Sequence, residues 1–271
     1  KQLIATAITD KGVNTLATDT FQTMATNISN ITGGSKQKDA YRENRVLIWE
    51  DDFDGAELDT SKWSIYVREK LNHAAYTTDE PDNVYVENSN LVLQAIKRNY
   101  NGSTQPWTSG FVRTNNLAEF KYGRIEAKIK MPKVPGTWPA FWTMGANHDD
   151  DFTNGNPTFE GANNLGEKWP QCGELDILEQ YGTSDYVETA MWYNASSDKD
   201  NQNATQFGTG RISNIDINEY HIYGIEWTEE KIDVFVDDKI FKTYTNYPDA
   251  FKQAHYLMLN LAIGGTAGAT S

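Results

Sequence analysis

The sequence has little cysteine, little proline and no long apolar run, and each shortage excludes a class of protein. Its 271 residues include one cysteine, Cys172, which excludes an intrachain disulfide and a multi-cysteine metal site. The longest apolar runs, such as residues 257–263, are far shorter than the roughly 20 residues of a membrane-spanning helix. We therefore expect a soluble protein with no membrane partner.

Positive charge is also scarce. The chain has 24 Lys and Arg against 38 Asp and Glu, which gives a net charge of −14. Nucleic-acid phosphates repel so acidic a chain, so no nucleic-acid partner is expected. Aromatic residues are abundant instead, with 8 Trp, 14 Tyr and 11 Phe. This mixture favours a β-rich domain in which some aromatic rings lie outside the core and can contact a ligand.

The first 34 residues differ in kind from the rest. Apolar residues recur at helical spacing before Gly12 and again before Gly33, which predicts a short helical hairpin over residues 1–34. The polar residues 35–44 are typical of a linker. The segment "IATAITDKGVNTLATDTFQTMATNISNI" resembles helices of bacteriophage and prophage tail proteins, and a partner chain is one surface on which such short helices can pack. A cloning remnant or a flexible appendage is the alternative.

From residue 45 the pattern changes to short β-type runs. In "GRIEAKIKM" (residues 123–131) apolar and charged residues alternate, which indicates a sheet covered on one side. Many such runs in one domain predict an all-β fold, a two-sheet β-jelly roll sandwich over residues 45–271 with the helical appendage in front. The expected strands include residues 46–49, 123–131, 140–144, 174–179, 222–227, 231–236 and 256–262.

Three carboxylates, Glu174, Asp176 and Glu179, lie inside one of these expected strands. Residues two apart share a face, so Glu174 and Asp176 point one way and Glu179 points the other. One extra residue between Asp176 and Glu179, a β-bulge, would bring all three acids to one face and turn Ile177 or Leu178 toward the core.

The separation of the two glutamates then indicates a reaction. On the bulged strand their Cα atoms would be roughly 13 Å apart, and inward-leaning side chains would bring the carboxyl groups to about 5–6 Å, as in retaining glycosidases. The charge of Asp176 between them would help keep one glutamate protonated, as a general acid requires. A solvated sheet face and calcium ligation are the two alternatives for such a group of acids.

The segments "GELDILEQYG" (residues 173–182), "GTWPAFWTMG" (136–145) and "YGRIEAKIKMP" (122–132) resemble glycoside hydrolase family 16, in its laminarinase-like, bulged branch. The resemblance runs from Leu47 to Gly265. It implies a jelly roll with a curved groove and retaining endo-hydrolysis of β-linked glucans or galactans. It further implies that Glu174 is the nucleophile, Glu179 the general acid/base and Asp176 the assisting carboxylate.

Substrate-binding residues are expected beside the acids. Indole rings stack on the C–H faces of sugars, and Trp138, Trp142 and Trp169 flank the acidic strand, although a core position is an equal alternative for Trp142. Arg124 is expected to bind sugar hydroxyls or the nucleophile. Its alternative is a surface ion pair with Glu126 or another acid. Asn260 is a groove residue by its family position.

The sequence departs from the family pattern at three places. Met191 stands where laminarinase-like members carry a histidine, so substrate or acid/base tuning would differ. The insertion at residues 147–168, with Asp149, Asp150 and Asp151, is expected to form an acidic loop that favours a neutral β-glucan over sulfated polymers. The chain ends before the family's last "VDYVRVY" strand; the open readings are a truncated chain, an incomplete one, or one completed by its N-terminal segment.

No metal or other cofactor is expected from the sequence. None of the four histidines, His73, His148, His221 and His255, has H-x-x-x-H spacing. Cys172 lacks a nucleophile signature and is predicted to be a packed thiol. A structural calcium ion, common in the family, is the alternative, but its ligands come partly from the strand that the chain lacks.

The leading hypothesis is an extracellular or virion-borne endo-β-1,3- or mixed-linkage β-1,3/1,4-glucanase with a polysaccharide substrate. An agarase-like β-galactanase of the same family is one alternative. A non-catalytic carbohydrate-binding jelly roll or phage adhesin is the other. The presence of both Glu174 and Glu179 favours hydrolysis, because a protein that only binds carbohydrate has no need of both.

Overall fold

A computed structural model describes residues 45–69, 74–148, 167–196 and 203–265. The predicted helical hairpin, the linker, Asp149–Asp151, His73 and the last residues lie outside this part. The chain divides into two compact units, residues 1–50 and 51–271. The expected strand at 46–49 is wrong: residues 45–50 form no strand, and Val46 and Ile48 are 84% and 81% exposed. Without a buried face on which to place these side chains, apolar alternation alone does not make a strand.

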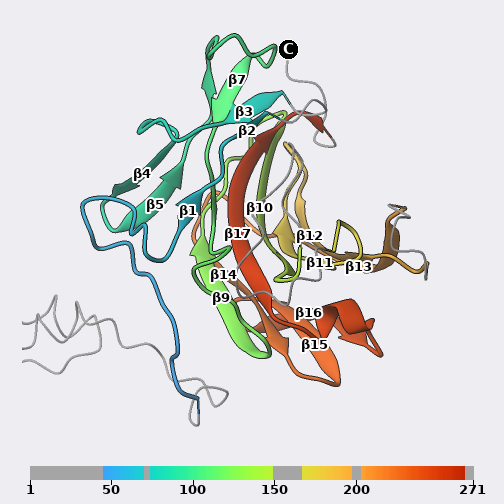
Figure 1. Cartoon of the computed structure of the whole chain (residues 1–271). Coiled ribbons are helices and arrows are strands. Elements are labelled where there is room, and N and C mark those ends of the chain that lie inside the picture. Colours follow the sequence, from blue (N-terminus) through green and yellow to red (C-terminus); the bar gives the residue numbers. More distant parts are fainter. Residues whose placement is uncertain (1–44, 70–73, 149–166, 197–202, 266–271) are drawn as a thin grey trace, which may run out of the picture. The chain divides into compact units, whose positions relative to one another are not determined.

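Two large antiparallel sheets build the second unit (Figure 1). The first has seven strands in the order β1 (Ser64–Ile65), β8 (Phe111–Arg113), β17 (His255–Ile263), β10 (Thr137–Gly145), β11 (Glu174–Glu179), β12 (Tyr186–Tyr193) and β13 (Thr205–Ser213). The second has the order β16 (Lys239–Thr245), β15 (Lys231–Val236), β14 (His221–Trp227) and β9 (Gly123–Ile129).

Two smaller sheets complete the described part. One has the order β2 (Arg68–Glu69), β3 (Ala75–Thr77), β7 (Trp107–Ser109) and β6 (Ile96–Lys97), and the other is the hairpin of β4 (Val84–Glu87) and β5 (Asn90–Leu93). A 3-10 helix lies at Asp249–Phe251, between β16 and β17. Within those ranges no helix has the length and apolarity to cross a membrane.

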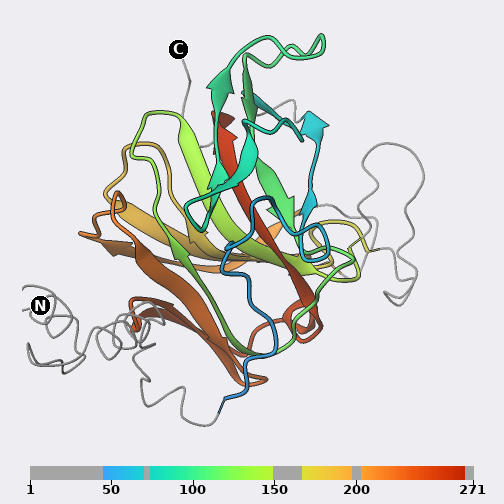
Figure 2. The same ribbon diagram turned by 90° about the vertical axis from the view of Figure 1, so that its left-hand side faces the viewer.

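The core lies between the two large sheets, which form separate layers (Figure 2). In the four-stranded sheet, Ile125, Ile225 and Val234 are partners in register and point to the same side, where all three are buried. In the seven-stranded sheet, Leu175 and Met191 are partners and are also buried. Alternation on both sheets thus fills one interior, and the predicted all-β jelly-roll sandwich is confirmed.

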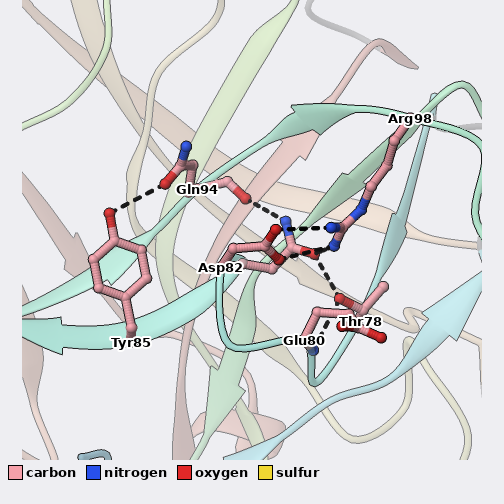
Figure 3. Close-up of polar contacts among 7 residues, drawn as sticks. Thr78, Glu80, Asp82, Tyr85, Gln94 and Arg98 are labelled. Carbon is pink, nitrogen blue, oxygen red and sulfur yellow. Dashed lines mark hydrogen bonds and ion pairs between the residues drawn. The ribbon is translucent and has the colours of Figure 1, made fainter.

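A buried polar network fixes the segment in front of β4 (Figure 3). Asn83 is fully buried; it accepts hydrogen bonds from Thr78 Oγ1 at 2.6 Å and Arg98 Nη2 at 2.7 Å, and it donates to the Gln94 carbonyl at 2.8 Å. Arg98 also binds both carboxylate oxygens of Asp82, at 2.8 and 3.0 Å. The bidentate pair and the bonded Asn83 amide fix this loop to Gln94 and Arg98, which flank β6.

Candidate active site

The three acids of β11 share one face because the strand is bulged. On the β10 side, Trp142 pairs with Asp176 and Phe141 with Leu178, so Ile177 is the extra residue. On the β12 side, the register likewise shifts between Asp176 and Glu179. Ile177 and Leu178 are both 1% exposed. The predicted bulge is therefore confirmed, together with the burial of the residues that it turns inward.

Strand pairing extends this face across the sheet. Glu179 is in register with Ala140 of β10 and Glu188 of β12, and Ala140 is in register with Asn260 of β17. Directly paired residues point to the same side of a sheet. We call the side that carries the acids the carboxylate face, and it is opposite to the core that contains Leu175 and Met191. Its acids are Glu174, Asp176, Glu179 and Glu188.

Neutral aromatic donors hold these carboxylates. Trp138 Nε1 donates to Glu179 Oε1 at 2.8 Å, and the Tyr181 hydroxyl donates to Glu179 Oε2 at 2.9 Å. Trp169 Nε1 donates to Glu174 Oε2 at 2.7 Å. These bonds fix both glutamates at the two ends of the bulged segment. Because indole and phenol are uncharged donors, they orient the acids without neutralising them.

Burial and like charge raise the affinity of this face for protons. The pKa of Asp176 lies well above its usual value because the carboxyl is buried and because Glu179 and Glu174 carry charge nearby; a hydrogen bond from the Trp192 side chain opposes the rise. Burial also raises the pKa of Glu179, against the hydrogen bonds from Tyr181 and Trp138. Glu179 thus binds a proton more tightly than an exposed glutamate does, which is what a general acid needs.

One carboxyl oxygen of Asp176 is buried and makes no hydrogen bond to the described residues. Asp176 is 3% exposed, and its Oδ2 has no hydrogen-bond partner among the residues that the structure describes. An unpaired buried carboxylate oxygen is costly, whereas in the protonated carboxyl group the same oxygen can be a hydrogen-bond donor. The face therefore combines neighbouring carboxyl groups of raised pKa, which suits nucleophilic and acid/base chemistry.

Trp142 and Asn260 join the same face. Trp142 Nε1 donates to Asn260 Oδ1 at 2.7 Å, across 118 residues of sequence. Trp142 and Trp169 also pack, half-buried, on a cluster of Met144, Cys172, Tyr256 and Met258. The predicted tryptophans and Asn260 thus lie with the acids. Cys172 is buried, as predicted, and burial raises the pKa of its thiol.

Arg124 is not part of this face, and its expected role in binding is wrong. It lies on β9 in the other large sheet, where its guanidinium binds Glu126 at 2.7 Å, Glu226 at 2.9 Å and Asp238 at 2.6 Å. The alternative, a surface ion pair that includes Glu126, is what the structure contains. The physical reason is the pairing of β9 with β14, which places Arg124 opposite Glu226.

Met191 does not face the acids either. Its partner in register is Leu175, and it is 0% exposed in the core. Met191 therefore withholds no polar contact from the carboxylate face, contrary to the expectation that an exchange here would alter the site directly. The neighbouring Trp192 has the parity that reaches Asp176.

Sequence reasoning missed four residues of this site: Tyr181, Glu188, Trp192 and Arg211. Arg211 of β13 pairs in register with Glu188, and its Nε donates to Glu188 Oε2. Glu188 and Trp192 of the "ETAMW" segment are an even number of residues apart, so they point to the same face of the strand. Which face that is follows only from the register of this strand with β11.

The described residues contain no group of three or more His, Cys, Asp or Glu arranged to hold a metal ion. His255 is instead fully buried; its Nδ1 and Nε2 contact Thr143 and the Ala250 carbonyl at 3.0 Å each. Burial lowers the pKa of His255 to about 4, so the ring is a neutral part of the core. The calcium alternative of the sequence analysis stays a prediction.

Comparison with known proteins places this geometry in context. A family model described as glycosyl hydrolases family 16 matches residues 71–155 and 157–270. A β-glucanase from Rhodothermus marinus is 31% identical over 244 residues, which cover 82% of this chain and 77% of the relative. A glucan endo-1,3-β-glucosidase A1 from Niallia circulans is 29% identical over 81% of this chain, which spans 34% of that longer protein.

Solved structures agree with the sequence relatives. The structure of LamAcat from Zobellia galactanivorans superposes with a TM-score of 0.71 at 30% identity, covering 83% of this chain and 90% of that one. A laminarinase from Rhodothermus marinus gives a TM-score of 0.66 at 30% identity, over 81% of this chain and 86% of that one.

Proposed function

Because the chain belongs to glycosyl hydrolase family 16, we propose that it is a retaining, endo-acting enzyme that hydrolyses β-1,3-glucan or mixed-linkage β-1,3/1,4-glucan. Relatives named as endo-1,3-β-glucosidase, β-glucanase and endo-1,3-1,4-β-glycanase support this substrate class. The observation that carries the proposal is the bulge at Ile177, which brings Glu174, Asp176 and Glu179 to one face.

The two glutamates have separate roles in this proposal. Glu174 is the nucleophile, held by the Trp169 indole, and Glu179 is the general acid/base, held by Trp138 and Tyr181. The more deeply buried Glu179, with its raised pKa, is the better proton donor. The raised pKa of Asp176, which lies between them, favours its protonated form and so reduces the negative charge that its neighbours experience.

The reaction proceeds in two displacements. The Glu174 carboxylate attacks the anomeric carbon while the bond from that carbon to the leaving oxygen breaks, and Glu179 gives its proton to that oxygen. Glu179, now ionised, then takes a proton from a water molecule whose oxygen attacks the same carbon and releases Glu174. Two inversions give net retention, and the site is restored.

The aromatic residues supply substrate binding. Trp138, Trp142 and Trp169 all donate their indole N–H groups to acceptors of the carboxylate face, so what each half-buried ring offers a ligand is its apolar surface. Such surfaces suit the C–H faces of glucose rings. The acidic character of the chain, with its net charge of −14, favours a neutral polymer over a sulfated or uronic one.

The test is hydrolysis of laminarin, lichenan, agarose and carrageenan in parallel, read as released reducing ends. We expect cleavage of laminarin or lichenan, with the β-anomer as the first product by proton NMR. Glu174→Gln should lower kcat by about 10³-fold or more, whereas Glu126→Gln, which changes an acid of the other sheet, should keep full activity. Near-normal glucan cleavage by the Glu174→Gln variant would refute the proposal.

The alternatives predict other outcomes of the same panel. Cleavage of agarose alone would indicate the agarase-like galactanase, and binding of glucan without turnover would indicate a carbohydrate-binding scaffold or adhesin. No observation on the carboxylate face favours either. An extracellular or virion-borne location belongs to the proposal, because polysaccharides of this class lie outside the cytoplasm.

A further inference from the structure

Glu188 is an acid of the carboxylate face that the two displacements do not use. It lies on β12 directly opposite Glu179, so both side chains project to the same side, and it is only 8% exposed. Across its other edge, Arg211 of β13 is its partner in register and forms an ion pair with it. Glu179, Glu188 and Arg211 therefore form one row across three strands.

We propose that Glu188 and Arg211 are a positioning unit that sets how tightly Glu179 holds its catalytic proton. The inference rests on the proposed function, in which Glu179 is the proton donor. A buried negative charge on the facing strand favours the protonated form of Glu179, and the Arg211 cation limits that effect by compensating Glu188. The unit acts through Glu179 and does not touch the reacting atoms.

The charged groups around Glu179 lie on its own strand, on β12 and on β13. The pKa of Glu179 is raised by burial first and by the charge of Glu188, and it is lowered by the hydrogen bonds from Tyr181 and Trp138. The Glu188 charge also raises the pKa of Asp176. The groups that face Glu179 in the described residues are Glu174, Asp176 and Tyr181 on its own segment, Glu188 on β12, Arg211 behind it on β13, and the uncharged Trp138, Ala140 and Asn260 on β10 and β17.

The two members of the unit should differ in strength. The Glu188 side chain is 10% exposed, so solvent screens its charge little. The Arg211 side chain is 57% exposed, and its guanidinium lies 4.4 Å from the centre of the Tyr186 ring, which fixes its position. Arg211 therefore weakens the influence of Glu188 without cancelling it.

The first test is the pH profile of kcat/KM on laminarin, whose basic limb reports the loss of the proton from the general acid. Glu188→Gln keeps shape and removes the charge, so the basic limb should move to lower pH by about one unit. Arg211→Gln leaves Glu188 uncompensated, so the limb should move to higher pH by about half a unit. Shifts of the basic limb in opposite directions for two neighbouring residues would show that their charges act on the proton affinity of Glu179.

Matched variants separate this role from a structural one. Arg211→Lys keeps the charge and should restore the wild-type limb, and the Glu188→Gln/Arg211→Gln double variant should resemble Glu188→Gln. Glu126→Gln removes an equal charge from the other sheet and should not move the limb. If the pair only braced the strands, both single variants would lose activity equally at every pH, and that result would overturn the inference.

A second measurement does not depend on turnover. The side-chain carboxyl carbon of Glu179 is followed by NMR in protein labelled with ¹³C at glutamate, with the signal assigned by its absence in Glu179→Gln. The pH midpoint of its titration should be lower in Glu188→Gln and higher in Arg211→Gln than in the wild type. Unmoved titrations in both variants, with laminarin still cleaved, would sink the inference and leave the proposed function intact. Moved titrations in a protein that cleaves no glucan would uphold the coupling and refute the function.

Discussion

Both large sheets carry a row of acids, and the two rows are held by different partners. On β9, β14 and β15, Arg124 binds Glu226 at 2.9 Å, and Lys231 binds Asp233 at 2.6 Å. On β11 the acids are held by tryptophan and tyrosine donors. A cation beside a carboxylate strongly favours its ionised form, whereas a neutral hydrogen-bond donor orients the carboxylate and lowers its pKa less. The first row supports the sandwich, and the second is equipped for catalysis.

The largest effect is expected from replacing Asp176, the middle acid of β11, by its neutral isostere. Asp176→Asn should lower kcat by about 100-fold, because it removes the group that sits between nucleophile and acid. It should also raise Tm at pH 7 by about 2–4 °C. The sign follows from its raised pKa: the folded state binds more protons than the unfolded one, so stability is lost as pH rises above the ordinary carboxyl range.

Activity assays and thermal unfolding at pH 4 and pH 7 check this prediction. The Tm gain of the Asp176→Asn variant should shrink at pH 4, where about half of the Asp176 carboxyl groups are already protonated in the unfolded state. A variant that is both inactive and less stable at pH 7 would show that the Asp176 charge is compensated in the native protein.

A loss of stability with little loss of activity is expected when the acids on β9, β14 and β15 lose their cation. Arg124→Gln leaves three acids without their shared cation, so the free energy of unfolding should fall by about 2 kcal/mol. Denaturant unfolding measures this loss. Because Arg124 lies on the other sheet, kcat/KM should stay within about twofold of wild type at a temperature where the variant is folded. A large loss of kcat/KM in the folded variant would show that Arg124 does contribute to the active site.

The smallest effect concerns a neutral donor. Trp138→Phe keeps an aromatic ring but removes one hydrogen bond that lowers the pKa of Glu179. The basic limb of the pH profile should therefore move to higher pH by a few tenths of a unit, with kcat at the optimum reduced by less than about tenfold. Tyr181→Phe, which removes the other donor, is the matched variant and should move the limb in the same direction.

The sequence predicted the local part of this site well. The parity of Glu174, Asp176 and Glu179 required a bulge, and Trp138, Trp142 and Trp169 were found because they stand close to the acids in sequence. What it missed depends on register. Glu188 and Arg211 reach the face only through the pairing of β11 with β12 and of β12 with β13. Arg124 was misplaced because alternation tells which residues share a face, and not which sheet or side that face belongs to.

The most direct test of the central claim is to trap the covalent intermediate. The nucleophile should displace fluoride from the anomeric carbon of a 2-deoxy-2-fluoro laminaribiosyl fluoride, and the 2-fluoro glycosyl group should then accumulate on it. Mass spectrometry of peptides after protease digestion locates this label. The bulged geometry predicts the label on Glu174, at full occupancy of one per chain. A label on Glu179 or Glu188, or turnover with inversion and no label, would contradict the assignment of roles along β11.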